Sequence, residues 1–191
     1  MGTIALETSN NMNKLKCMLR TTLIIGSILL VSFRVQGQFK LDNVASSMYL
    51  DGTSTLHDWT IVVEEMSGLL SAEVADNHIS SIGSAQVIVL VKSMKSGKSG
   101  MDENIYKALQ QEDFPKIHYK LKDYIVHNGT MTVKGELTIA GVTKAVETKV
   151  EHKILDGNVI IDGKLSFKMT DFEISPPEFL FGAFKTGDDI V

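Results

Sequence analysis

The chain has 191 residues, of which 43% are hydrophobic and 22% are charged, and its formal net charge is −4. This length predicts a single domain. The charge is too low for a disordered acidic chain and has the wrong sign for the basic surface that a nucleic-acid binder needs. A single cysteine excludes an internal disulfide and any zinc or iron–sulfur site with several cysteine ligands.

The N-terminal segment has the pattern of an export signal. Three basic residues precede an uncharged, mostly apolar run over 21–33. The basic residues are Lys14, Lys16 and Arg20. The run is shorter than the ~20 residues of a membrane-spanning helix and has the proportions of a signal peptide. A short uncleaved anchor is the alternative.

The small residue Gly37 predicts cleavage between Gly37 and Gln38. We therefore expect a signal peptide at 1–37, with Met12 or Met18 as alternative starts, and one mature domain at 38–191. The mature protein is expected in the periplasm or outside the cell, without a stable membrane anchor. Cys17 would be removed with the signal.

The rest of the chain is typical of consecutive antiparallel strands. In the first half the candidate strands are 39–50, 53–64, 67–75 and 86–92, with Gly52 and Gly68 as breaks. In the second half apolar and polar residues alternate with period two over 117–122, 131–139, 146–154 and 159–169. Such alternation indicates strands with one buried and one wet face. Asn128-Gly129 and Asp156-Gly157 predict hairpin turns, because these residues tolerate positive φ.

One segment, 99–111, departs from this pattern. Ser99 is a candidate N-cap, the first turn is acidic, and apolar residues recur every three to four positions, which predicts a short helix. About eight strands and one helix predict an all-β fold, an up-and-down antiparallel barrel, with a β-sandwich as the alternative.

The segment 182–191 has the pattern of a strand that has barely begun where the sequence stops. The closing strand of the barrel is therefore expected to be incomplete. An unpaired edge would expose the apolar lining and favour pairing with a second copy, as a homodimer.

The inward faces of the alternating strands supply an aliphatic lining. Its candidate ligand-binding residues are Val133, Leu137, Ile139, Val146, Val150, Ile161, Leu165 and Phe167. An eight-stranded barrel is just wide enough to be filled by side chains or to hold one small ligand. The residues alone leave both a filled core and an apolar ligand cavity open.

His57 and Asp58 form the polar pair of the sequence that most suggests acid–base chemistry. Neighbours on an extended strand point to opposite faces, so the two side chains cannot form a catalytic dyad directly, and His57 is expected to order a turn. The five His residues lack metal-binding spacing, and no common enzyme signature occurs, so neither a metal nor a cofactor is expected. A hydrolytic enzyme using His57 or His118 with Asp58 or Glu112 is the least favoured alternative.

Several stretches, in this order along the chain, resemble the YceI-like family. They are 52–59, 86–94, 101–111, 112–119, 135–144 and 168–174. The most specific is Gly135-Glu-Leu-Thr-Ile-Ala-Gly-Val-Thr-Lys144. Lys98-Ser-Gly-Met-Asp102 departs from the family, because many members carry an Arg-Asp element there.

The resemblance implies an exported, lipocalin-like barrel with a long apolar tunnel that takes a polyisoprenoid or a similar lipid. The lining residues named above would then contact the ligand, with His57 as a polar contact near the mouth. The departure at 98–102 puts an arginine contact with a polar head group in doubt. An envelope interaction module with a filled core and no small-molecule ligand is the alternative function.

Overall fold

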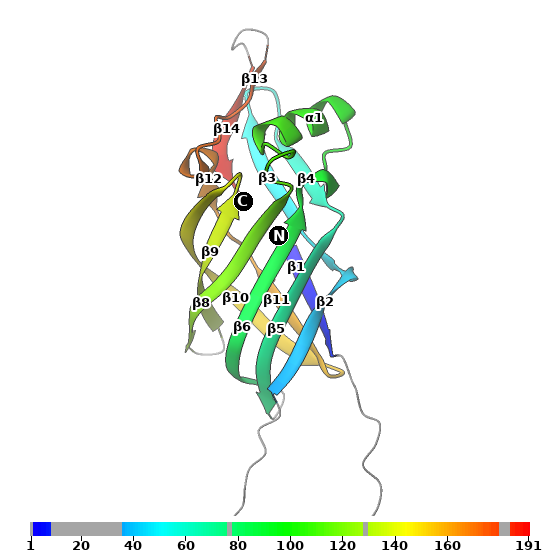
Figure 1. Cartoon of the computed structure of the whole chain (residues 1–191), viewed down its shortest axis with the longest axis vertical. Helices are drawn as coiled ribbons and strands as arrows, with labels where there is room; N and C mark the ends of the chain where they lie inside the picture. Colours follow the sequence, from blue (N-terminus) through cyan, green and yellow to red (C-terminus); the bar gives the residue numbers. More distant parts are fainter. Residues whose placement is uncertain (1, 9–35, 76–77, 128–129, 180–183) are drawn as a thin grey trace, which may run out of the picture.

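A closed antiparallel β-barrel forms the body of the molecule (Figure 1). The computed structural model describes residues 2–8, 36–75, 78–127, 130–179 and 184–191. Around the barrel the strands follow the order β1-β11-β10-β9-β8-β6-β5-β2. Their bounds are β1 (Gly2–Thr8), β2 (Gln36–Ser47), β5 (Met66–Ala75), β6 (His78–Leu90), β8 (Lys116–His127), β9 (Thr130–Ile139), β10 (Val142–Leu155) and β11 (Asn158–Gly163). The predicted eight-stranded, all-β barrel is confirmed, and the β-sandwich alternative is wrong.

A second sheet continues the barrel wall at its upper end, in the order β12-β14-β3-β4-β7. Its strands are β3 (Tyr49–Ser54), β4 (Trp59–Val63), β7 (Met94–Lys95), β12 (Phe167–Lys168) and β14 (Phe184–Ile190), and β13 (Glu178–Phe179) pairs with β14. The helix α1 (Ser99–Ala108) lies at this end of the molecule. Short 3-10 helices occupy Val91–Ser93 and Met169–Phe172. The second sheet and α1 therefore extend the upper end of the barrel.

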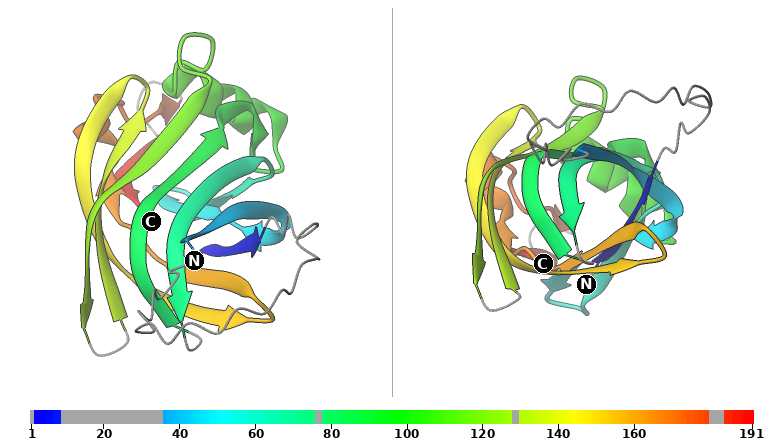
Figure 2. Two further views of the ribbon diagram at one scale, coloured as in Figure 1. Left: turned by 60° about the horizontal axis from the view of Figure 1, so that its bottom comes forward. Right: turned by 90° about the horizontal axis from the view of Figure 1, so that it is seen from below.

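The barrel closes in a way that the sequence did not predict. β14 pairs with β3 and β12 in the upper sheet, whereas lower down the gap between β2 and β11 is filled by β1. Figure 2 shows β1 in dark blue within the ring of strands. Within 38–191 the closing strand is incomplete, as expected, because β14 reaches only β3 and β12. In the full chain, β1 supplies backbone partners to both remaining edges. While β1 is in place these edges are paired, and the homodimer stays a prediction.

The segment predicted as an export signal is only partly described. Residues 2–8 form β1, and β2 begins at Gln36. The apolar run at 21–33 and Cys17 lie outside the described residues. The predicted signal peptide therefore stays a prediction.

Gly52 and Gly68 lie inside strands and do not break them. A Cβ at Gly52 would lie 2.1 Å from the indole ring of Trp59, so the glycine permits the ring to cross β3. Gly68 pairs with Val87 within β5 and β6. β6 starts at His78, earlier than predicted, because two register shifts against β5 disturb its alternation.

Two of the predicted local signals are tested directly. Asp156 and Gly157 have φ values of 51° and 80°, which confirms the hairpin turn. Asn128-Gly129 lies outside the described residues. The predicted helix is confirmed but ends at Ala108, and Lys98, not Ser99, is its N-cap residue.

The lower part of the barrel is filled by side chains. Leu70, Met131 and Val159 are exposed by 2%, 2% and 0%, and they belong to the larger core cluster. A smaller cluster higher up is built around Leu137, Ile139, Ala140, Phe172 and Ile174. Among the residues that the structure describes, the Tyr119 hydroxyl and His152 Nδ1 are buried without hydrogen-bond partners. Burial raises the pKa of Tyr119.

Candidate functional site

An apolar cavity of about 470 Å³ lies at the upper end of the barrel, between α1 and the strands of the second sheet. The helix contributes Met101, Ile105 and Ala108, on one face of its turns. The strands contribute Trp59, Ile61, Ile117, Ile139, Phe167 and Ile190. The volume falls within the ~300–1,000 Å³ of small-molecule sites, which are also mostly apolar. The site therefore suits an apolar ligand.

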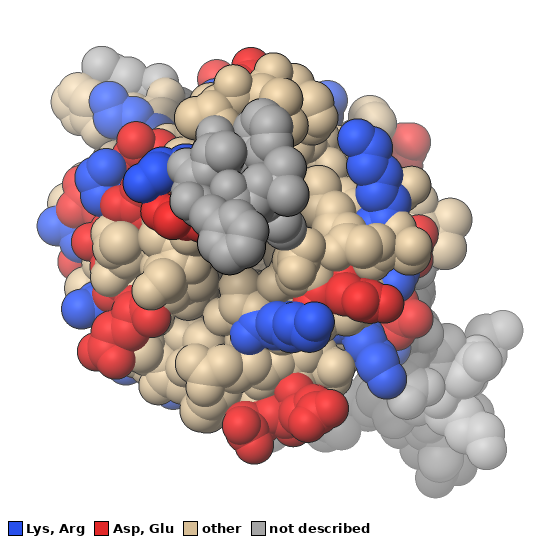
Figure 3. All heavy atoms as spheres, turned by 90° about the horizontal axis from the view of Figure 1, so that it is seen from above, with Lys and Arg blue, Asp and Glu red and all other residues tan. Residues whose placement is uncertain are grey.

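The charged residues that line this cavity, Lys98 and Lys185, are exposed. Seen from above, lysine and acidic side chains surround uncharged surface (Figure 3). Among the lining residues, Lys98, Asn104 and Lys185 carry amine or amide side chains. Lys185 Nζ lies 3.1 Å from Glu178 Oε1, whereas Lys98 has no ion pair among the described residues. An amphiphile could therefore bury its chain while its head group meets cations at the rim.

His57 also lies at the rim, on the turn between β3 and β4. The Ser54 hydroxyl donates to the His57 carbonyl oxygen at 2.7 Å and accepts from the His57 amide at 3.2 Å. Nδ1 of His57 lies 2.9 Å from the carbonyl oxygen of Asp58, not from its carboxylate. His57 is thus part of an ordered turn beside the cavity, as the sequence predicted.

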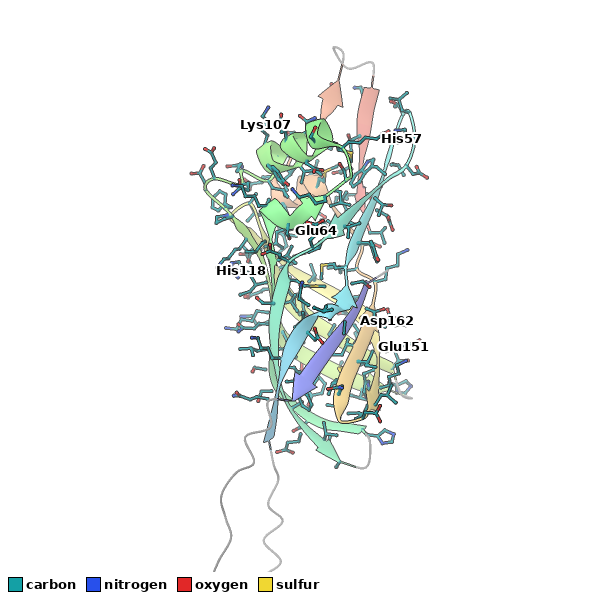
Figure 4. The ribbon with its side chains drawn as sticks, turned by 90° about the vertical axis from the view of Figure 1, so that its right-hand side faces the viewer. His57, Glu64, Lys107, His118, Glu151 and Asp162 are labelled. Carbon is teal, nitrogen blue, oxygen red and sulfur yellow. The ribbon has the colours of Figure 1, made fainter. Side chains whose placement is uncertain are left out.

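The enzyme alternative also invokes His118 and Glu112, which do not line the cavity with His57. His118 lies on β8, on a different side of the barrel from His57 (Figure 4). Glu112 follows α1 and does not line the cavity. Within the described ranges, no group of three or more His, Cys, Asp or Glu residues could hold a metal ion. Nor does the described part of the chain contain a helix long and apolar enough to cross a membrane.

A polar network fixes α1 above the cavity. Asp102 Oδ1 accepts hydrogen bonds from Ser96 N at 2.8 Å and from Ser96 Oγ at 2.7 Å. These bonds, with the Lys95 ammonium 3.9 Å from Oδ2, lower the pKa of Asp102. Because Ser96 follows β7, the network ties the first turn of the helix to the second sheet.

The second turn of α1 is tied to the same segment. Lys95 Nζ donates to the Tyr106 hydroxyl at 2.5 Å, which raises the pKa of Lys95. The hydroxyl in turn donates to the carbonyl oxygen of Lys92 at 2.9 Å. Two successive turns are thus anchored, and the apolar face of α1 stays over the cavity.

Asp102→Asn is expected to destabilise the protein at pH 7 by about 1–2 kcal/mol, because hydrogen bonds to a charged acceptor are lost. The folded-state pKa of Asp102 lies below its unfolded value of about 4, so this stabilisation is complete above pH ~4 and disappears as the pH falls through the lower folded pKa. Urea unfolding at pH 7 and pH 3 measures it. The difference in free energy of unfolding between the wild type and Asp102→Asn should be smaller at pH 3 than at pH 7. Glu103→Gln, a change to an exposed acid of the same helix, should unfold like the wild type at both pH values. A constant gap would contradict the network.

The predicted lining residues fall into three groups in the structure. Ile139, Phe167 and the polar candidate His57 line the cavity. Leu137, Val146 and Leu165 belong to or pack against the smaller core cluster. Val133, Val150 and Ile161 pack against the larger cluster, which fills the lower barrel.

Sequence reasoning missed the contribution of α1 and of Trp59 to the site. Met101 and Ile105 are two of the apolar residues that recur every three to four positions along the predicted helix. Their spacing signals that one face of the helix is buried, but it does not indicate which surface covers that face. Trp59 is brought to the cavity by its packing over Gly52.

A closed antiparallel barrel with an apolar cavity at one end defines a lipocalin-like architecture. The chain belongs to the YceI-like family, since the family model for the YceI-like domain matches residues 39–191. The resemblance seen in the sequence is therefore confirmed. None of the curated protein sequences matches the chain.

Solved structures with the same fold agree with this assignment. BcnA of Burkholderia cenocepacia is 17% identical with a TM-score of 0.64, over 78% of this chain and 93% of that one. A polyisoprenoid binding domain from Saccharophagus degradans, implicated in plant cell wall breakdown, is 17% identical with a TM-score of 0.55, over 73% and 82%. The YceI protein of Campylobacter jejuni is 20% identical with a TM-score of 0.51, over 60% and 70%. These similarities establish the fold.

Proposed function

We propose that the protein is a carrier that holds a polyisoprenoid or a similar long-chain apolar molecule in the cavity under α1. The apolar cavity is the observation that carries the proposal. Burying each methylene group of such a chain contributes about 0.8 kcal/mol without any catalytic residue. Membership of the YceI-like family, and the polyisoprenoid binding of the Saccharophagus degradans domain, support the same ligand class.

The position of the cavity limits how the ligand is held. The chain would enter beside α1, and its inner end would stop above the filled lower barrel, where Met131 and Val159 leave no space. The head group would stay at the rim near His57 and Lys98. This arrangement differs from a tunnel that runs the full length of the barrel.

The proposed place of action is outside the cytoplasm, in the periplasm or beyond the cell. Its support is the basic and apolar pattern before residue 37, which predicts export and cleavage between Gly37 and Gln38. The ligand-binding proposal does not depend on this location.

Trp59 provides the test of ligand binding, because it is the only tryptophan of the chain and lines the cavity. Titration with a polyprenol should change its fluorescence saturably, and an organic extract of protein purified from its native host should contain a long-chain lipid by mass spectrometry. A short, polar alcohol such as glycerol is the control and should leave the fluorescence unchanged. Absence of both the fluorescence change and a co-purified lipid would overturn the proposal.

A further inference from the structure

Two segments from opposite ends of the sequence share one strand position of the wall. β3 continues β2 after Met48, and β12 continues β11 after residues 164–166, so these pairs form two long edges. Between the edges, β14 fills the upper part and β1 fills the lower part. Both run antiparallel to their neighbours, so they point in the same direction. We call the lower part, between β2 and β11, the strand slot.

β1 occupies the strand slot through backbone pairing on both sides. Gly2–Leu6 pair with β11, and Thr3–Thr8 pair with β2. Along the chain, β1 is joined to the rest of the barrel only through residues 9–35, which lie outside the described ranges. Without β1, each edge would carry a row of unpaired amide and carbonyl groups, which is the usual template for adding a strand.

The inner face of the strand slot requires apolar residues at alternate positions. Ile4 pairs with Ile161, and Leu6 pairs with Val159. Val159 is fully buried in the larger core cluster, and Ile161 packs against that cluster. Because residues paired across an antiparallel ladder share one face of the sheet, a segment in the slot needs apolar residues opposite Val159 and Ile161.

The outer face of the strand slot is bordered by Lys40 and Asp42 of β2 and by Asp162 of β11. Glu7 pairs with Lys40 of β2, whose side chain is exposed. The Thr3 hydroxyl donates to Asp162 Oδ2 of β11 at 3.3 Å. A segment that fits the slot therefore combines apolar alternation with a hydroxyl opposite Asp162 and an acid opposite Lys40.

We propose that the strand slot is an exchangeable binding site for an extended segment of a partner polypeptide. Gly2–Thr8 fills the slot while it is attached to the chain, and the partner segment replaces it when the connection at 9–35 is cut. Signal cleavage after Gly37, near the start of β2, would also separate Gly2–Thr8 from the rest of the barrel. The partner segment is defined by chemistry, with apolar residues at the positions of Ile4 and Leu6 and an acid at that of Glu7. This inference goes beyond lipid binding and does not depend on it.

The test uses the full chain with a specific protease site inserted between Asn10 and Asn11, cut after the protein has folded. The fragment carrying Gly2–Thr8 should stay bound during gel filtration, and a fluorescent Gly2–Thr8 peptide should replace it, which raises the anisotropy of the peptide. A control peptide with Ile4→Lys and Leu6→Lys should not bind. Equal binding of the two peptides, or no binding while the Trp59 fluorescence of the cut protein is unchanged, would overturn the proposal.

A charge exchange tests whether the peptide adopts the observed register. Lys40→Glu should lower the affinity of the protein for the wild-type peptide by about threefold. A Glu7→Lys peptide should restore this affinity, as expected for a cross-strand ion pair. A second measurement covers the case in which the cut chain unfolds. In an uncut Cys17→Ser protein, Ala5→Cys combined with Ile160→Cys should cross-link within one chain, because these residues pair in the ladder. No intramolecular cross-link would overturn the proposal.

Discussion

Met131→Ala is expected to lower the free energy of unfolding by about 2–5 kcal/mol, the usual cost of truncating a fully buried large side chain. Met131 is 2% exposed, lies on β9 opposite Val150, and belongs to the larger core cluster. Close packing prevents the neighbouring strands from collapsing into the space that the side chain leaves. Urea unfolding followed by Trp59 fluorescence measures the change.

The control for Met131→Ala is Ile125→Ala, at an exposed position near the same end of the barrel. Ile125 is 54% exposed, so its truncation should change the free energy of unfolding by less than about 0.5 kcal/mol. A loss below 1 kcal/mol for Met131→Ala would contradict the filled lower barrel. It would indicate that the cavity continues past β9 toward the bottom.

Ala108→Phe is expected to weaken polyprenol binding at least tenfold while the protein stays folded. Ala108 lies on the cavity side of α1, and the added ring would occupy space that the ligand needs. The ring would enter a pre-existing cavity, so the overpacking penalty of about 1–3 kcal/mol seen in filled cores should be largely avoided. Fluorescence titration measures the affinity for polyprenol, and thermal unfolding shows whether the protein stays folded. The variant keeps Trp59 as its only tryptophan.

Lys107→Phe is the matched control for Ala108→Phe, because it makes the same addition one residue earlier, on the exposed side of the helix (Figure 4). Its affinity should equal that of the wild type. Equal affinity for Ala108→Phe as well would place the ligand elsewhere. A similar loss in both variants would indicate that α1 itself had been displaced.

The parts of the fold that depend on local pattern could be predicted from the sequence. At 131–139 every second residue faces the interior of the barrel, so the strand β9 can be predicted from its own alternation without knowledge of its partner strands. The hairpin turn at Asp156-Gly157 can also be predicted, because its residue types match its positive φ values. Gly52 misled the prediction, since it serves the close approach of the Trp59 ring and not a turn.

Features that depend on distant partners could not be predicted in the same way. Ile4 and Leu6 do alternate with more polar residues, but nothing local indicates that residues so near the start pair with β11, near residue 160. The docking of α1 depends on contacts of Asp102 and Tyr106 with residues 92–96, and the apolar face of the helix does not specify them. The cavity depends on this docking of α1. The sequence therefore predicts only lining residues that lie on strands, such as Ile139 and Phe167.

The shared strand position makes the fold cyclic in its connectivity. The Val191 and Asp51 backbones exchange two hydrogen bonds, while Thr3 pairs with Ser47, so only the two ladder positions opposite Leu50 and Tyr49 separate Val191 from Gly2. The opposite edge agrees, because Ile190 pairs with Phe167 and Gly2 with Gly163. A peptide link of two residues would therefore merge β14 and β1 into one strand. A circular permutant with that link, beginning at Gln36 and ending with Thr8, would then trace the same barrel with its long strand unbroken.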